Sequence, residues 1–387
     1  MTDFNELVER RGTSCLKYDF APERGKPGDV LPLWVADMDF RTAPCVLDAL
    51  EKAVRHGIFG YSEAKGGYYD ALIAWYKERH GFTIEPGWVV KTPGVVYALA
   101  AAVRCLTEPG DSVLLLSPVY YPFYEVIRDN GRRLAESPLR YDGERYTIDF
   151  EDLEEKIRDN GVKLLLFCSP HNPVGRVWTE EELQRVNEIS ERCSCFVVSD
   201  EIHADFSWEG RRHHVFPLSE RLIICTSPSK SFNLAGLQIS NIIIPDRSLR
   251  KRFLKEKDRT GYSQSGTLGL VACQAAYEGG GEWLDELKAY IWENFLYLRD
   301  ALPEGMRLIG PEGTYLGWID CKGLGLSASD LEDFITHRAK LWLDGGSMFG
   351  PSSALFQRIN AACPRSTLEE AVRRLDAAKA SKGSPGK

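Results

Sequence analysis

The sequence lacks the long apolar runs of a membrane protein, since none approaches the ~18 residues that a spanning helix needs. Its first residues, MTDFNELVERRGTS, include acidic side chains and no apolar core, so they predict no secretion signal. Basic residues are outnumbered, 48 against 56 acidic, which gives a net charge of -8, and no basic stripe with interleaved aromatic residues is present. We therefore expect neither a membrane nor a nucleic-acid partner.

The ten cysteines lack the spacing of a disulfide scaffold or a metal site. The one close pair, CSC at 193–195, is not a CxxC motif, and several other cysteines lie inside apolar runs, where cysteine behaves as a small hydrophobic residue. This usage predicts a reduced, cytoplasmic protein. His203, His213 and His214 fit no zinc-binding pattern, so no metal site is predicted.

What the sequence does have is an alternation of short apolar runs with longer amphipathic or charged segments. One such segment, residues 179–193, begins with Thr179 and carries Glu182 three residues later, a capping-box pattern that predicts a helix. Buried strands that alternate with helices predict a mainly parallel sheet covered on both faces. No internal repeat is present. The apolar runs are SVLLLSP (112–118), VKLLLFCSP (162–170), CFVVSD (195–200), RLIICTS (221–227) and NIIIP (241–245).

Polar residues follow these runs at one end. They are Ser117-Pro118, the stretch from Ser169 to Asn172, Asp200, and the stretch from Ser227 to Lys230. The carboxyl ends of parallel strands share one edge of a sheet, and ligands of open α/β sheets bind there. We therefore expect these residues, although far apart in the sequence, to meet at one pocket.

Lys230 follows a buried strand and is either a solvated loop charge or a nucleophile. Asp200 ends a very apolar strand, where a carboxylate is costly unless it is paired, for example with a protonated heterocyclic nitrogen. Gly94 precedes an apolar helical segment, and a helix N-terminus approached by glycine binds anions. Ser227 and Ser229 add hydroxyl groups. A Schiff-base lysine, a partner for a ring nitrogen and a phosphate site together indicate pyridoxal phosphate.

Segments from about residue 4 to about residue 375 resemble the fold-type-I pyridoxal-phosphate enzymes of the class I/II aminotransferase superfamily. Within that superfamily, they resemble the MalY/PatB-type cystathionine β-lyases, which are C–S lyases. ADMDF, DEIHADF and SPSKSFNLAGL are highly specific in combination. The segments are LPLWVADMDF (31–40), FGYSEAKGGYYDAL (59–72), TPGVVYAL (92–99), SPVYYPFY (117–124), SPHNPVGRVW (169–178), VVSDEIHADF (197–206), SPSKSFNLAGLQISN (227–241), EGTYLGW (312–318) and FQRINAAC (356–363).

The resemblance implies a large cofactor-binding domain at residues 47–285 and a smaller α+β domain built from both termini. Residues 1–46 would supply an N-terminal arm and part of the small domain, and residues 286–387 the rest. We expect the tail from about residue 380, which is low in apolar content, to be disordered. The resemblance also implies a homodimer with active sites shared across the interface.

The resemblance implies the role of each residue around the cofactor ring. Lys230 would hold the cofactor covalently and later move the Cα proton of the substrate, and Asp200 would pair with the pyridine nitrogen. Asn172 would hydrogen-bond the ring 3-oxygen, and Tyr120 would stack on the ring face. His203 stands where many aminotransferases of the superfamily carry a tyrosine.

The resemblance also implies the phosphate and substrate contacts. The implied phosphate ligands are Gly94, Val95, Ser227 and Ser229, with Tyr61 from the partner subunit. The implied substrate-binding residues are Arg358, which would bind the carboxylate, the backbone of Val35 and Ala36, and Asn172. Many members place an arginine eight residues after the lysine to hold phosphate, but Gln238 occupies that position here. Residues 348–360 also depart from a more glycine-rich pattern in the lyases.

Each assignment has a structural alternative. Asp200 could cap a helix, Asn172 could only form a turn, and His203 could be a satisfied core histidine. The remaining alternatives are core packing by Tyr120 with Tyr121 or Tyr124 as the stacking residue, packing of Tyr61 within its own chain, and a structural ion pair at Arg358. Ser117-Pro118 and Asn172-Pro173 are candidates for cis peptide bonds.

The resemblance implies a β-lyase that cleaves L-cystathionine or a related L-cysteine thioether to a thiol, pyruvate and ammonia. An aminotransferase would use the same residues and is the first alternative. A regulatory, protein-binding member of the same family is the second.

Overall fold

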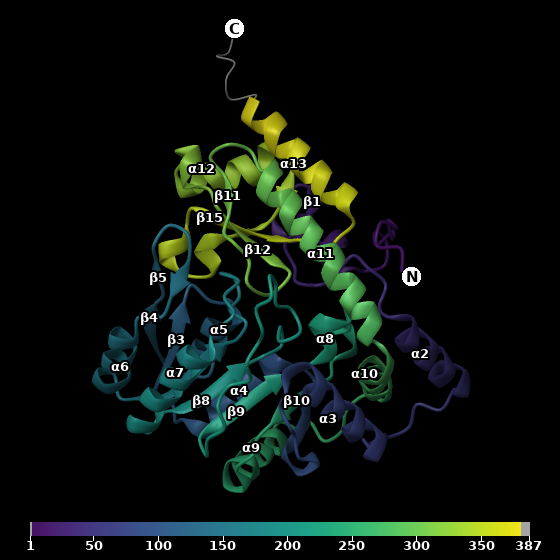
Figure 1. Cartoon of the computed structure of the whole chain (residues 1–387), viewed down its shortest axis with the longest axis vertical. Coiled ribbons are helices and arrows are strands. Elements are labelled where there is room, and N and C mark those ends of the chain that lie inside the picture. Colours follow the sequence, from purple (N-terminus) through teal and green to yellow (C-terminus); the bar gives the residue numbers. More distant parts are fainter. Residues whose placement is uncertain (1, 381–387) are drawn as a thin grey trace.

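The computed structural model describes residues 2–380, and the expected disordered tail lies outside them from residue 381 on. A sheet of seven strands forms the larger half of the molecule (Figure 1). Its strands, in spatial order, are β2 (Val89–Thr92), β10 (Ser240–Ile243), β9 (Leu222–Thr226), β8 (Phe196–Asp200), β7 (Val162–Cys168), β3 (Ser112–Ser117) and β4 (Arg133–Pro138).

The prediction of a mainly parallel sheet is confirmed. Strands β9, β8, β7, β3 and β4 pair in parallel, and each of the five predicted apolar runs forms a strand. The NIIIP run is the exception in direction, because β10 pairs antiparallel with both β9 and β2.

Helices cover both faces of this sheet because side chains alternate between the faces. Val113 and Leu115 of β3 pack into one hydrophobic cluster with α4 (Val95–Leu106), α5 (Pro122–Arg128) and α9 (Arg247–Arg259). Leu114 and Leu116 pack into another, with α6 (Phe150–Asp159) and α7 (Glu180–Arg192). The capping box of α7 is present, with Thr179 and Glu182 bonding reciprocally. Helix α10 (Thr267–Gly279) packs against α2 (Pro44–His56) and α3 (Gly66–His80).

A second, antiparallel sheet lies above the first in Figure 1. Its strands are β11 (Arg307–Leu308), β12 (Leu316–Asp320), β15 (Phe356–Asn360) and β14 (Asp344–Gly345). Strand β1 (Leu31–Pro32) pairs with β13 (Leu341–Trp342), so segments from the N-terminal and C-terminal parts of the chain lie side by side. Helices α11 (Gly281–Ala301) and α13 (Arg365–Ala380) flank it. The domain limits stay a prediction, and the one at 285/286 falls inside α11.

The shorter elements are α1 (Leu16–Asp19), α8 (Pro228–Ser231), α12 (Ala328–Asp333), β5 (Arg140–Tyr141) and β6 (Tyr146–Thr147). Within residues 2–380, no helix combines the length and the apolar character needed to cross a membrane. The peptide bonds at Ser117-Pro118 and Asn172-Pro173 are cis, as predicted, and Ser169-Pro170 is a third cis bond that the sequence reading did not anticipate.

Candidate active site

The carboxyl ends of the parallel strands lie together, as the sequence predicts. Cys168 of β7, Asp200 of β8 and Cys225 of β9 are paired across the sheet. A cavity of about 360 Å³ opens at this edge. The predicted site residues that line it are Ala36, Gly94, Val95, Tyr120, Asn172, Asp200, His203, Ser229 and Lys230.

Lys230 lies on the short helix α8, half-buried against the cavity. Its Nζ donates a hydrogen bond to the carbonyl oxygen of Ala36 over 2.6 Å. Burial and the nearby Arg358 lower the pKa of the amine to about 8, although the carboxylates of Asp37 and Asp200 oppose that shift. No residue in the described range 2–380 forms an ion pair with Lys230. It is therefore not a solvated loop charge, and its role as a nucleophile stays a prediction.

Asp200 is buried at the end of β8 and faces the same cavity. Burial raises the pKa of its carboxyl to about 7, while the Ile202 amide, which donates to Oδ1 over 3.1 Å, and Lys230 lower it. Residues 202–205 form turns, so Asp200 does not cap a helix as the structural alternative proposed. A buried carboxylate with one backbone donor still has room for a cationic partner, such as a protonated ring nitrogen.

The start of α4 borders the cavity through Pro93, Gly94, Val95, Val96 and Tyr97. The first N–H groups of a helix have no partner within the helix and favour an anion. A methyl group at Gly94 would meet nothing within 4 Å, so the space beside the helix end is open.

One serine and one glutamine complete this end of the cavity. Ser229 and Gln238 line it, but Ser227 does not. The Oγ of Ser227 accepts from the Ser229 amide over 3.0 Å and lies 2.7 Å from the carbonyl oxygen of Ile239. Ser227 is therefore the N-cap residue of α8. An anion at this end of the cavity would therefore meet backbone amides, a hydroxyl and a neutral amide, and no arginine lines the cavity within residues 2–380.

His203 is buried at the cavity wall, and its Nδ1 has no hydrogen-bond partner. It is therefore not the satisfied core histidine of the structural alternative. Burial lowers its pKa well below the usual value, and Lys230 and Arg358 lower it further, so the ring is neutral. An unpartnered ring nitrogen, a buried carboxylate, a cavity-facing lysine and a helix N-terminus are together the groups that pyridoxal phosphate needs. The residues present fit that cofactor.

Comparison with known proteins gives the family. A model of the class I and II aminotransferases matches residues 28–375. The chain belongs to this family. It is 40% identical over 385 residues to the cystathionine beta-lyase PatB of Bacillus subtilis, covering 97% of this chain and 99% of that protein. It is 37% identical over 382 residues to the protein MalY of Escherichia coli, covering 96% and 97%.

A solved structure agrees with this assignment to the aminotransferase family. Cystalysin from Treponema denticola, whose structure contains a pyridoxal 5'-phosphate cofactor, superposes with a TM-score of 0.95 at 38% identity. The match covers 99% of this chain and 100% of that one. The prediction of a fold-type-I architecture is thereby confirmed.

Of the three candidate tyrosines, only Tyr120 lines the cavity. Tyr124 instead donates from its hydroxyl to the carbonyl oxygen of Phe349 over 2.8 Å, and Tyr121 packs edge-on against the Phe349 ring. The geometry thus favours Tyr120 over both alternatives as the residue that stacks on a bound ring.

Arg358 is 2% exposed and lies one layer behind the cavity wall. Its Nη1 donates to Oδ1 of Asn172 over 3.0 Å, and its Nη2 donates to the carbonyl oxygen of Trp34 over 2.9 Å and pairs with Asp344. The structural ion pair given as an alternative is therefore present. Asn172, in turn, is more than a turn residue, because it joins the cavity to Arg358. The binding of a substrate carboxylate by Arg358 stays a prediction.

Tyr61 does not reach the cavity of its own chain. It is 95% exposed, and Ile58 and Phe59 beside it are 71% and 58% exposed. Its predicted role in a partner subunit therefore stays a prediction.

The sequence did not indicate two residues that contact predicted site residues. Tyr315 donates to the Ala36 carbonyl oxygen over 2.9 Å, and its only signal was its place in the EGTYLGW segment. Asp344 lies beside Arg358 because β14 pairs with β15, and no local sequence pattern predicts that pairing.

Proposed function

We propose that the protein is a pyridoxal-phosphate-dependent C–S β-lyase whose substrate is L-cystathionine or a related L-cysteine thioether. L-Cystathionine and water would give L-homocysteine, pyruvate and ammonia. The observation that carries the proposal is that Lys230 and Asp200 line one cavity, in a chain 40% identical to a cystathionine beta-lyase over 97% of its length.

The residues that would hold the cofactor are those whose polar groups face the cavity. The start of α4 and the hydroxyl of Ser229 would take the phosphate, and Asp200 would take the ring nitrogen. Tyr120 would cover the ring face, with His203 and Asn172 at its polar edge. When bound, pyridoxal phosphate supplies an aldehyde that bonds amines and a ring that spreads the negative charge left at the substrate Cα.

The residues around the cavity would have separate roles in the reaction. Nζ of Lys230, with a pKa lowered to about 8, is partly unprotonated near neutral pH and can take the Cα proton. Asn172 and Arg358 would orient the substrate carboxylate through their shared hydrogen bond. A protonated ring nitrogen beside Asp200 would lower the pKa of the carboxyl and keep it an anion. The anion would in turn raise the pKa of the ring nitrogen and keep it protonated.

The aminotransferase reading is the second candidate, because the matching family model carries that name. Incubation with L-cystathionine in the absence of a 2-oxo acid separates the two. A lyase releases pyruvate continuously, since each turnover returns the enzyme to its starting state. An aminotransferase releases no pyruvate. It converts one equivalent of L-cystathionine per site to the corresponding 2-oxo acid and then stops until another 2-oxo acid is added, and that outcome would overturn the lyase proposal.

We further propose a homodimer in which Tyr61 enters the partner's cavity. The exposed Ile58, Phe59 and Tyr61 support this, because an apolar cluster of this kind is typical of an interface. Mixed dimers of Tyr61→Phe and Lys230→Ala subunits test it. If the site is shared, one cavity in each mixed dimer carries neither substitution and activity returns on mixing. Activity no higher than the average of the parents would place Tyr61 within its own chain.

A further inference from the structure

Residues 33–40, called here the strap, contain no helix or strand and yet cross the active site. Donors from distant parts of the chain bind its carbonyl oxygens in succession. The backbone amide of Asn360 binds Leu33, Arg358 binds Trp34, and Asn233 binds Met38 and Phe40. An irregular segment keeps a single conformation only when its polar groups are satisfied in this way. The strap is therefore a rigid part of the site.

Within the strap, the carbonyl oxygen of Ala36 accepts the hydrogen bond from the amine of Lys230. Nζ lies 2.6 Å from this oxygen, and the hydroxyl of Tyr315 donates to the same oxygen over 2.9 Å. An oxygen that accepts two donors fixes the direction of both. The Ala36 carbonyl thus defines where the amine rests whenever Lys230 is not bonded to cofactor or substrate.

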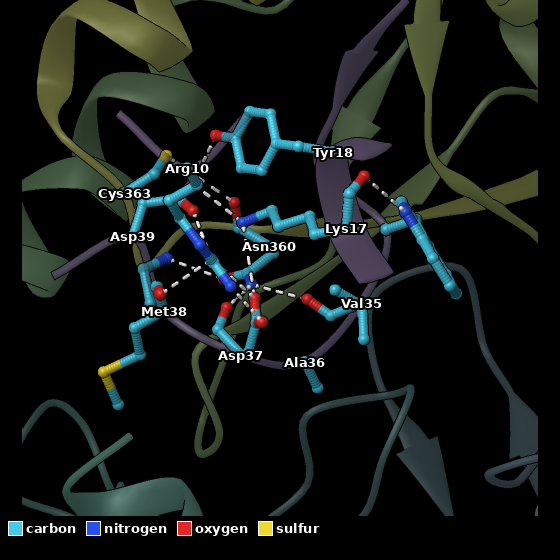
Figure 2. A network of polar contacts seen from close by, with 12 residues as sticks. Arg10, Lys17, Tyr18, Val35, Ala36, Asp37, Met38, Asp39, Asn360 and Cys363 are labelled. Carbon is cyan, nitrogen blue, oxygen red and sulfur yellow. Dashed lines mark hydrogen bonds and ion pairs between the residues drawn. The ribbon is translucent and has the colours of Figure 1, made fainter. Parts of the chain in front are cut away.

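Asn360 holds the strap on either side of that carbonyl. Its Nδ2 donates to the carbonyl oxygen of Val35 over 2.8 Å and to that of Asp37 over 2.5 Å (Figure 2). The side chain is itself fixed, because it is fully buried at the end of β15 and its Oδ1 accepts from the Ala362 amide over 2.8 Å.

Ion pairs also hold the strap, as Figure 2 shows. Arg10 pairs with Asp37 over 2.6 Å and with Asp39 over 2.7 Å. Lys17, fully buried, lies 2.7 Å from Asp39. These pairs hold the side-chain carboxylates of Asp37 and Asp39, whereas Asn360 holds the backbone carbonyls on either side of Ala36.

We propose that Asn360 is a positioning residue for the reacting amine: by fixing the carbonyls of Val35 and Asp37, it holds the Ala36 carbonyl where Nζ of Lys230 docks. The inference rests on the proposed role of Lys230 as the reacting amine. It is independent of which amino-acid substrate the enzyme prefers.

Replacement of Asn360 by the nearly isosteric leucine tests this. In the holoenzyme, Asn360→Leu should lower kcat by about 10- to 100-fold with little change in KM, because a misplaced reacting group costs rate more than binding. In the cofactor-free full-length chain, acetic anhydride should acetylate Lys230 about 3- to 10-fold faster, since a displaced carbonyl no longer stabilises the protonated amine. Peptide mass spectrometry, with the other lysines as internal references, measures that rate.

Asn294 provides a matched control. It is also fully buried. Its Nδ2 also donates to two carbonyl oxygens that are separated by one residue, those of Ala361 and Cys363, over 3.0 and 2.8 Å. Asn294→Leu should lower the thermal unfolding midpoint as much as Asn360→Leu does but leave the Lys230 acetylation rate unchanged. Equal changes of that rate in both variants would reduce Asn360 to a structural residue.

Other outcomes also decide the proposal. An unchanged acetylation rate in Asn360→Leu would overturn it, whatever happens to turnover. Should that variant not fold, Asn360→Ser, which keeps one donor, carries the same test with a smaller expected change. The acetylation rate does not depend on the reaction catalysed, so failure of the lyase proposal, seen as a lack of pyruvate from the unsubstituted enzyme, remains distinguishable.

Discussion

Lys17 and Lys230 are two buried or half-buried lysines attached to the same strap, and they differ in their partners. Lys17 is 0% exposed and lies 2.7 Å from the carboxylate of Asp39. Lys230 has an uncharged partner, the Ala36 carbonyl, and a pKa lowered to about 8. The amine of Lys17 thus lies against a carboxylate, whereas burial without an ion pair leaves the amine of Lys230 ready to lose its proton. The partner, not the residue type, separates Lys17, which holds the strap, from Lys230, the proposed reacting amine.

The largest expected effect comes from removing the reactive amine. Lys230→Ala should lower kcat on L-cystathionine by on the order of 10⁴-fold, because proton transfer by a positioned base contributes up to that much. It should also abolish the borohydride-reducible bond between protein and cofactor, which mass spectrometry detects. A reducible bond that persists in this variant would identify another lysine as the anchor.

The next effect belongs to the carboxylate that faces Lys230 across the cavity. Asp200→Ala should reduce turnover by about 100- to 1,000-fold, the usual loss for one electrostatic stabiliser, and should weaken cofactor retention. Steady-state kinetics and the absorbance of the bound cofactor after gel filtration measure both. Near-normal turnover with full cofactor content would contradict the role of Asp200.

Removal of the amine should change the free energy of unfolding differently at the two lysines. Lys17→Met leaves Asp39 buried with fewer partners and should cost about 3 kcal/mol of unfolding free energy. In the cofactor-free chain, Lys230→Met removes a desolvated amine that lacks an ion pair, and it should leave stability unchanged or raise it. Urea unfolding of the two variants provides the comparison, and a similar loss in both would break it.

The smallest expected effect is a shift of the pH at which the acetylation rate of Lys230 is half-maximal. An ordinary lysine is half-deprotonated near pH ~10.4. Since burial lowers the pKa of Lys230 to about 8, its acetylation in the cofactor-free chain should rise through about pH 8 and level off above it. The acetylation rate rises with pH because the neutral amine is the reactive form. A half-rise near the ordinary value would show that the cavity does not desolvate the amine.

The fold was largely predictable because its signals are local. The five apolar runs are long enough to form buried strands, and the capping box at Thr179 and Glu182 marks the start of α7. The direction of β10 was not predictable, since an apolar run reads the same whether its partner strand is parallel or antiparallel.

The site was predictable where residues follow a strand, and much less so elsewhere. Asp200 is the last residue of β8, and Lys230 and Asn172 lie four residues after the ends of β9 and β7, so the strand order brings them together. The position of Arg358 behind the cavity wall, paired with Asp344, depends on two short strands with no such pattern.

The sequence by itself determined the alternation of strands and helices, the polar residues at the strand ends, and hence the cofactor chemistry. Only the tertiary structure decided which lysine is paired and which is not, because Asp39 and Ala36 are three residues apart in one strap and yet receive different amines. The clamp by Asn360 joins residues more than 300 positions apart. Such contacts depend on where an irregular segment comes to rest, and no local periodicity records that position.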